Sequence, residues 1–264
     1  MIHKVVMASF AAAWEMLIEL PVPASVKNAG IDFEDDVFSP LIQMSFPVVG
    51  VVAGLIIFFF GGILSMLSMK ISGAVIFAIT LTLLTELKDS FRSLGALVSL
   101  FDQLLAKKPL GYAMVNLDND VRNAAGPLSS LVLVLAVLLK LFTFYLMFYC
   151  GYCYWIIAVL VLSFTIQGHL AAAPALNTGL PVIEISHDTR LHIWAVAGFF
   201  ILFILFKSPY VSLIAFATAF VFANVVRRFC EIKLNGVTID IISLSGYLFE
   251  LYALLLGVLF LSRT

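Results

Sequence analysis

The chain has 264 residues, of which 62% are hydrophobic and only 12% are charged, and its formal net charge is -1. Soluble domains carry about 25% charged residues, so this composition excludes an ordinary soluble globular protein. A near-neutral net charge provides no excess of positive charge for binding nucleic acid. Three cysteines are too few for a disulfide framework. We therefore expect an all-α, polytopic membrane helix bundle.

The first 44 residues are expected to lie at the membrane surface. Residues 5–20 are apolar but short, and they carry Glu15 and Glu19. This pattern predicts an interfacial helix, and no small-residue cleavage site marks it as a secretory signal. Residues 21–44 form a polar segment whose acids, expected to be solvated, are Asp32, Glu34, Asp35 and Asp36.

Long apolar runs predict about seven transmembrane helices, all within a single integral membrane domain that covers residues 1–264. Crossing the bilayer takes about 20 apolar residues, so the run at 126–167 is long enough for two helices. We expect a tight turn between them near Cys150-Gly151, and a polar, amphipathic cytoplasmic segment at 86–124. The remaining predicted spans are residues 45–67, 71–85, 191–206, 208–225 and 241–262.

The distribution of charge predicts an orientation. If residues 86–124 are cytoplasmic, eleven basic residues lie on that side and three on the other, with Lys140 inside a span. Fifteen of the 16 acids share the first side, and the last, Glu250, lies in the final span. The positive-inside rule then predicts a multi-pass protein of the cell inner (cytoplasmic) membrane whose functional face is cytoplasmic.

Four short elements occur in order along the chain. They are Glu19-Leu20-Pro21-Val22-Pro23, Phe46-Pro47-Val48-Val49-Gly50, Asp120-Val121-Arg122 and Asn235-Gly236-Val237-Thr238-Ile239-Asp240. Their order and spacing resemble those of the cobalamin synthase family, the adenosylcobinamide-GDP ribazoletransferases. The match continues without a gap from the last element to Glu250, a position that is acidic in the family.

This resemblance implies a transferase that joins α-ribazole, or its phosphate, to adenosylcobinamide-GDP and releases GMP, the last step of cobalamin nucleotide loop assembly. It implies Mg²⁺ as cofactor and a corrinoid nucleotide as substrate. The further expected partners are membrane lipid and either a second copy of the chain or other enzymes of cobalamin synthesis. The implied catalytic residues are Asp102, Asp120, Arg122 and Asp240, the substrate-binding residues Lys140, Thr238, Gly236 and Glu250, and the metal ligands Asp89, Asp102 and Asp240.

The chain departs from the family at its metal-binding motif, a His followed by Asp-Gly-Leu-Ala-Asp-x-x-Asp. One register keeps Asp102 and leaves Gly95 and Ser99 at the other two acidic positions; the second keeps Asp89 and leaves Thr85 and Arg92. In both registers the His and two of three carboxylates are absent. Because Mg²⁺ prefers oxygen ligands, binding to a single remaining carboxylate would be weak unless Glu86, Asp120, Asp240 or Glu250 substitutes. If the chain is an enzyme, we expect Asp102, Asp120, Asp240 and Glu250 to converge near the cytoplasmic surface.

Several of these residues also have structural interpretations. Lys140 and Glu250 either contact an anionic substrate or form an interior ion pair, since a charge within a span needs a partner. Asp240 either binds metal or nucleotide, or caps the last helix. Cys150 and Cys153 have redox spacing, but no neighbouring charge would lower a thiol pKa. A metal site in a loop shared by His169, Glu184, His187 and Asp188 is less favoured than a solvated loop.

Two rival functions stay open. The first is a catalytically silent paralogue that keeps the fold and binds a corrinoid or a partner protein. The second is a small membrane transporter in which Lys140 and Glu250 are coupling residues. Inverted repeats or discontinuous helices would favour the transporter, and neither is evident in the sequence.

Overall fold

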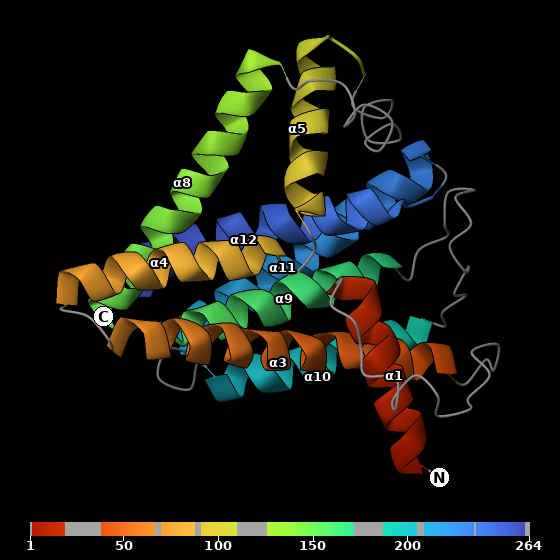
Figure 1. Cartoon of the computed structure of the whole chain (residues 1–264). Coiled ribbons are helices and arrows are strands. Elements are labelled where there is room, and N and C mark those ends of the chain that lie inside the picture. The colour runs from red at the N-terminus through yellow and green to blue at the C-terminus, as the bar shows by residue number, and fades with distance from the viewer. Residues whose placement is uncertain are drawn as a thin grey trace.

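A computed structural model describes residues 2–18, 38–66, 70–87, 91–109, 126–171, 187–204, 209–234 and 236–261, in which the regular elements are all helical (Figure 1). This confirms the predicted all-α bundle. The α-helices are α1 (Ile2–Leu17), α3 (Phe38–Met66), α4 (Lys70–Leu87), α5 (Arg92–Leu105), α8 (Pro127–Cys150), α9 (Trp155–Ala171), α10 (His187–Ile204), α11 (Pro209–Phe229) and α12 (Ile239–Leu261). A π-helix, η1 (Cys230–Leu234), continues α11.

Each of the seven predicted spans coincides with a helix, but fewer are long enough to cross a bilayer by themselves. Four helices are sufficiently long and apolar: Leu41–Ile63, Pro127–Cys150, Tyr210–Leu234 and Ile239–Phe260. A fifth span results if α4 and α5, which meet at a bend of 79°, are counted together. The apolar helices Trp155–Ala171 and Leu191–Leu202 are shorter. The described helices are therefore those of a membrane protein with four or five full-length spans.

Helix α9 forms the centre of the bundle, and every residue from Trp155 to Leu170 is buried. It packs against α3, α10, α11 and α12 (Figure 1). A helix that is apolar on all sides is one that has neighbours on all sides. The contact with α3 is close because a Cβ atom at Gly50 would lie 2.8 Å from the Cα atom of Val161. Small residues allow helix backbones to approach in this way.

The turn between α8 and α9 lies where the sequence predicted it. Pro127 occupies the first turn of α8, where its missing N–H group costs nothing. The helix ends at Gly151, whose φ of 80° is in the left-handed region that glycine adopts without strain. Trp155 then begins α9.

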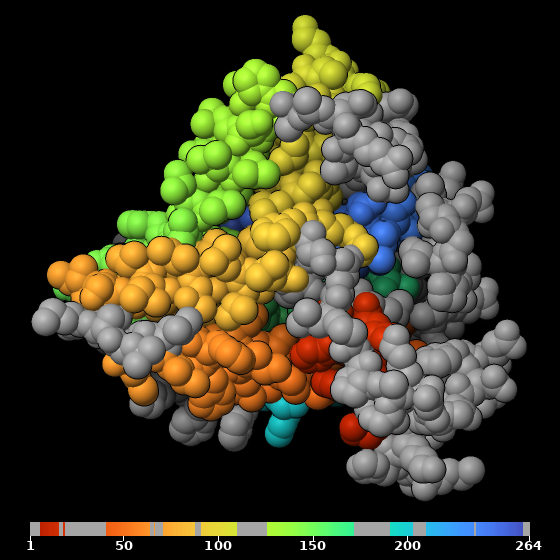
Figure 2. All heavy atoms as spheres, in the orientation of Figure 1, coloured from red at the N-terminus to blue at the C-terminus, as the bar shows by residue number. Residues whose placement is uncertain are grey.

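The segment predicted to be polar and amphipathic contains a helix that the sequence analysis did not specify. Helix α5 buries Leu94, Leu97 and Leu100, spaced three residues apart, against α8 and α12. In Figure 1, α5 and α8 extend together away from the remaining helices. Figure 2 shows α3, α4 and α8 on the outer surface. These helices expose large apolar side chains such as Phe59, Ile71 and Leu138, as expected for a surface that contacts lipid.

Helix α1 packs against α3 and crosses it (Figure 1). A helix is therefore present where one was predicted over residues 5–20, although it ends at Leu17. Its position at the membrane surface stays a prediction. Most of the predicted polar segment at 21–44 lies outside the described residues.

Candidate functional site: a buried charged cluster

Lys140 lies in the interior of the protein and is completely buried. Its Nζ atom is 2.5 Å from Oε1 of Glu86 and 2.9 Å from Oε1 of Glu250. It also donates a hydrogen bond to Oγ1 of Thr85 at 3.4 Å, and it lies 4.4 Å from the centroid of the Tyr247 ring. The contact between Lys140 and Glu250, one of the two interpretations offered by the sequence, is therefore present.

Three helices bring these groups together. Lys140 lies near the middle of α8 and Glu250 at the middle of α12, whereas Glu86 is the penultimate residue of α4. The chain bends immediately after Glu86, and the N–H group of Phe91 donates to the Glu86 carbonyl oxygen at 3.1 Å across that bend. Helix α4 thus ends beside the midpoint of α8, and Lys140 of α8 also contacts Glu250 at the midpoint of α12.

Burial makes these interactions strong and also makes them necessary. Each ion removed from water costs several kcal/mol, and only close partners offset that cost. The ammonium group of Lys140 has such partners on two sides, together with the face of the Tyr247 ring, which attracts cations. Glu86 and Glu250 are 3% and 1% exposed, so this cluster is closed to bulk solvent.

The sequence named Glu86 only as a possible substitute metal ligand, not as a partner of Lys140, and it did not single out Tyr247. A weak signal existed for each. Glu86 directly follows a predicted span, where an acid is costly unless it finds a partner, and Tyr247 precedes Glu250 by three residues, which puts both on one face of a helix. The sequence does not show which helix packs against the end of α4.

Asp102 lies elsewhere and stabilises the start of α8. Its carboxylate accepts hydrogen bonds from the N–H group of Gly126, at 3.2 Å, and from the Ser129 hydroxyl. Unpaired N–H groups at a helix start favour such an acceptor. Asp102 therefore acts as a cap supplied by a neighbouring helix.

The start of α12 contains the other predicted residues. Thr238 accepts a hydrogen bond from the N–H group of Ile241 at 3.3 Å, so Thr238 rather than Asp240 caps the helix. Asp240 lies in the first turn of α12 and is partly buried, and Gly236 lies in the short connection from η1. Asp89, Asp120 and Arg122 lie outside the described residues.

Among the described residues, Glu250 lies away from two of the acids with which it was expected to converge, Asp240 and Asp102. Asp240 and Glu250 are ten residues apart on one helix, which separates them by about 15 Å along its axis. Ser129, the partner of Asp102, is similarly about 16 Å along α8 from Lys140. Within the described ranges no group of three or more His, Cys, Asp or Glu side chains is arranged to hold a metal ion. Because Asp89 and Asp120 lie outside the described residues, the Mg²⁺ site stays a prediction.

The cysteine and histidine motifs also have structural explanations. Burial raises the pKa of the Cys153 thiol to about 11, so the thiolate needed for redox chemistry is scarce at neutral pH. Contrary to the predicted solvated loop, His169 is buried in α9, where its Nδ1 atom accepts a hydrogen bond from Nε1 of Trp194 at 3.2 Å. His187 begins α10, and Glu184 lies outside the described residues.

Fold and site together define a helical membrane protein with a buried charged cluster where three helices meet. Comparison with models of protein families, with curated proteins and with solved structures found no match.

Proposed function

We propose that this protein is a small membrane transporter in which binding of a proton or another cation is coupled to the ion pairs of Lys140. The observation that carries the proposal is the sharing of one buried ammonium group by carboxylates from two different helices. Ionisable groups inside a membrane are costly, and they typically mark ion pathways and proton relays.

The break between α4 and α5 adds to this argument. Discontinuous helices in transporters end near the middle of the membrane, where they form the binding site. Helix α4 ends next to Glu86, and Glu86 contacts Lys140 midway along α8. A discontinuous helix is one of the features expected of a transporter.

The shared ion pair has two alternative arrangements. When a proton or cation neutralises Glu250, Lys140 is held by Glu86 alone; when Glu86 is neutralised, Glu250 retains it. Each exchange changes the attraction between α4, α8 and α12. A packed interface with two arrangements of similar energy is the usual basis of such transitions.

The test is a charge-displacement measurement on proteoliposomes adsorbed to a solid-supported membrane. A pH jump should produce a transient current with wild-type protein, even for a tightly coupled transporter whose substrate is absent. Glu250→Gln should reduce the current to the level of protein-free liposomes. The matched control Glu231→Gln alters a carboxylate that pairs with Arg227 outside the cluster, and it should leave the current unchanged.

A wild-type protein without a transient current, or a Glu250→Gln current equal to the wild type, would contradict the proposal. Size-exclusion elution and thermal unfolding of each variant distinguish a lost proton site from a misfolded protein.

The resemblance to cobalamin synthases leaves the transferase as a second candidate, carried by the ordered sequence elements. Its test is GMP release from adenosylcobinamide-GDP, α-ribazole phosphate and Mg²⁺, with an active family member assayed in parallel. Release that is lost in Asp240→Ala would establish the transferase. Absence of release together with saturable corrinoid binding would instead identify the silent paralogue.

A further inference from the structure

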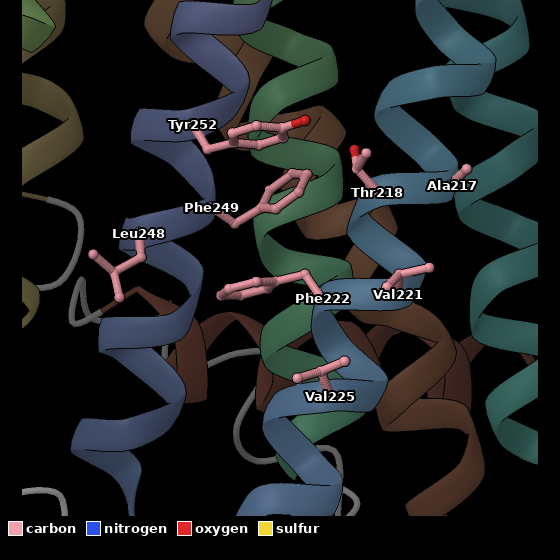
Figure 3. Close-up of a pocket in the computed structure, with 8 residues that line it drawn as sticks. All are labelled: Ala217, Thr218, Val221, Phe222, Val225, Leu248, Phe249 and Tyr252. Carbon is pink, nitrogen blue, oxygen red and sulfur yellow. The ribbon is translucent and has the colours of Figure 1, made fainter. Parts of the chain in front are cut away.

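A groove of about 570 Å³ lies between α11 and α12 (Figure 3). Its lining is almost wholly apolar. The rings of Phe222 and Phe249 are 5.9 Å apart between the two helices, and the Tyr252 ring is 5.7 Å from that of Phe249. Val221 and Val225 are 59% and 61% exposed, so the groove is open to the surroundings of the protein.

The shape of the groove fits a lipid chain. Its lining on α11 runs from Ala217 to Val225, a length of about 12 Å along the helix axis. Both helices are candidate membrane spans, so the groove faces lipid along its length. An acyl chain is elongated and apolar, and it gains contact with aromatic side chains when it lies in such a depression.

Basic side chains continue the groove at one end. Arg228 follows Val225 by three residues and Val221 by seven, so it lies on the same face of α11. It is exposed, as is Lys233 in η1. Arg227 pairs with Glu231 at 2.6 Å, whereas neither Arg228 nor Lys233 has an ion-pair partner among the described residues. Arg228 therefore places a positive charge on the groove face of α11, and Lys233 lies five residues further along the chain.

We propose that this groove binds one anionic phospholipid of the surrounding bilayer. The acyl chain lies along Phe222 and Phe249, and the phosphate group binds Arg228, with Lys233 nearby. Basic residues between membrane helices on the cytoplasmic side are suited to anionic head groups. The charge count of the sequence expects this end of α11 to be cytoplasmic. The site is separate from the Lys140 cluster and does not depend on the proposed transport.

A second copy of the chain fits the groove less well. Two copies inserted in the same orientation and related by a two-fold axis would bring their Arg228 side chains to the same leaflet at the contact. Like charges would then oppose association, whereas an anionic lipid neutralises them.

Native mass spectrometry of the full chain, released from micelles containing equal amounts of phosphatidylglycerol and phosphatidylcholine, tests the proposal. Wild-type protein should retain one phosphatidylglycerol in preference to phosphatidylcholine. Arg228→Gln should weaken that preference by about fivefold, the effect of one surface cation. Arg227→Gln is the matched control, because that side chain is already paired, and should change little. Val225→Trp should displace the lipid by filling the groove, whereas Ile71→Trp, at an exposed position of α4 away from the groove, should not.

Equal retention of both lipids, or equal effects of Arg228→Gln and Arg227→Gln, would overturn the proposal. A dimer that Val225→Trp dissociates would overturn it in favour of a second copy as occupant. Thermal unfolding of each variant in detergent establishes that the comparison is between folded proteins.

Discussion

Lys140 and Glu250 face each other from the middles of α8 and α12, with 2.9 Å between Nζ and Oε1, and neither side chain is more than 1% exposed. Removing one member of a buried ion pair leaves the other charge without compensation. We expect Lys140→Met to lower the free energy of unfolding by about 3–5 kcal/mol. The change would be measured by unfolding in mixed detergent micelles.

The double variant Lys140→Met with Glu250→Gln should recover part of that loss, because the second change removes an uncompensated carboxylate. Lys233→Met, at an exposed site, should stay within about 0.5 kcal/mol of the wild type. A Lys140→Met protein as stable as the control would show that the cluster contributes nothing to folding.

The contact of α3 with α9 predicts opposite outcomes for two glycines of the same helix. A Cβ atom at Gly50 would lie 2.8 Å from the Cα atom of Val161, and no side chain can move to relieve that clash. Gly50→Ala should therefore destabilise by about 1–3 kcal/mol. A Cβ atom at Gly62 would meet nothing within 4 Å, so Gly62→Ala should be neutral or stabilising. Equal melting temperatures for the two variants would contradict the close packing.

Asp102 is expected to act on α8 rather than on a metal ion. Asp102→Ala should lower stability by about 1 kcal/mol, the usual value of a helix cap. Hydrogen exchange should accelerate at the start of α8. Ser129→Ala removes the same contact, so the double variant should cost less than the two single changes added together. If Mg²⁺ raised the melting temperature of the wild type but not of Asp102→Ala, a metal role would replace this one.

Thiol labelling tests both the turn after α8 and its side of the membrane. The raised pKa of Cys153, about 11, means that little thiolate exists near neutral pH and that more forms as pH rises toward that value. Cys150 is exposed. An impermeant maleimide applied from outside near pH 7 should therefore label Cys150, and Cys150→Ser should abolish most of the signal. Labelling of that variant should increase with pH. If Cys150 were labelled only after the vesicles are opened, the predicted orientation would be wrong.

The sequence alone determined the helical membrane class and where its apolar helices lie, but not the amphipathic helix α5. Apolar runs separated by charged segments leave the backbone few alternatives in a bilayer, because each N–H and C=O group must be satisfied within its own segment. It also identified Lys140 and Glu250 as groups that need partners, since a charge in an apolar run is costly wherever it lies. The turn at Gly151 followed from the same local reasoning.

Only the tertiary structure decided which groups meet. Glu86 reaches Lys140 because α4 ends beside the middle of α8, and Asp102 caps α8 because α5 turns back along it. Asp240 and Glu250 belong to the same stretch of sequence that resembles the cobalamin synthase family. The rise of the helix over ten residues nevertheless keeps their side chains apart. Such contacts join residues far apart in the chain through bends and packing angles. Periodicity describes each helix by itself, whereas these angles are set by the side chains of its neighbours.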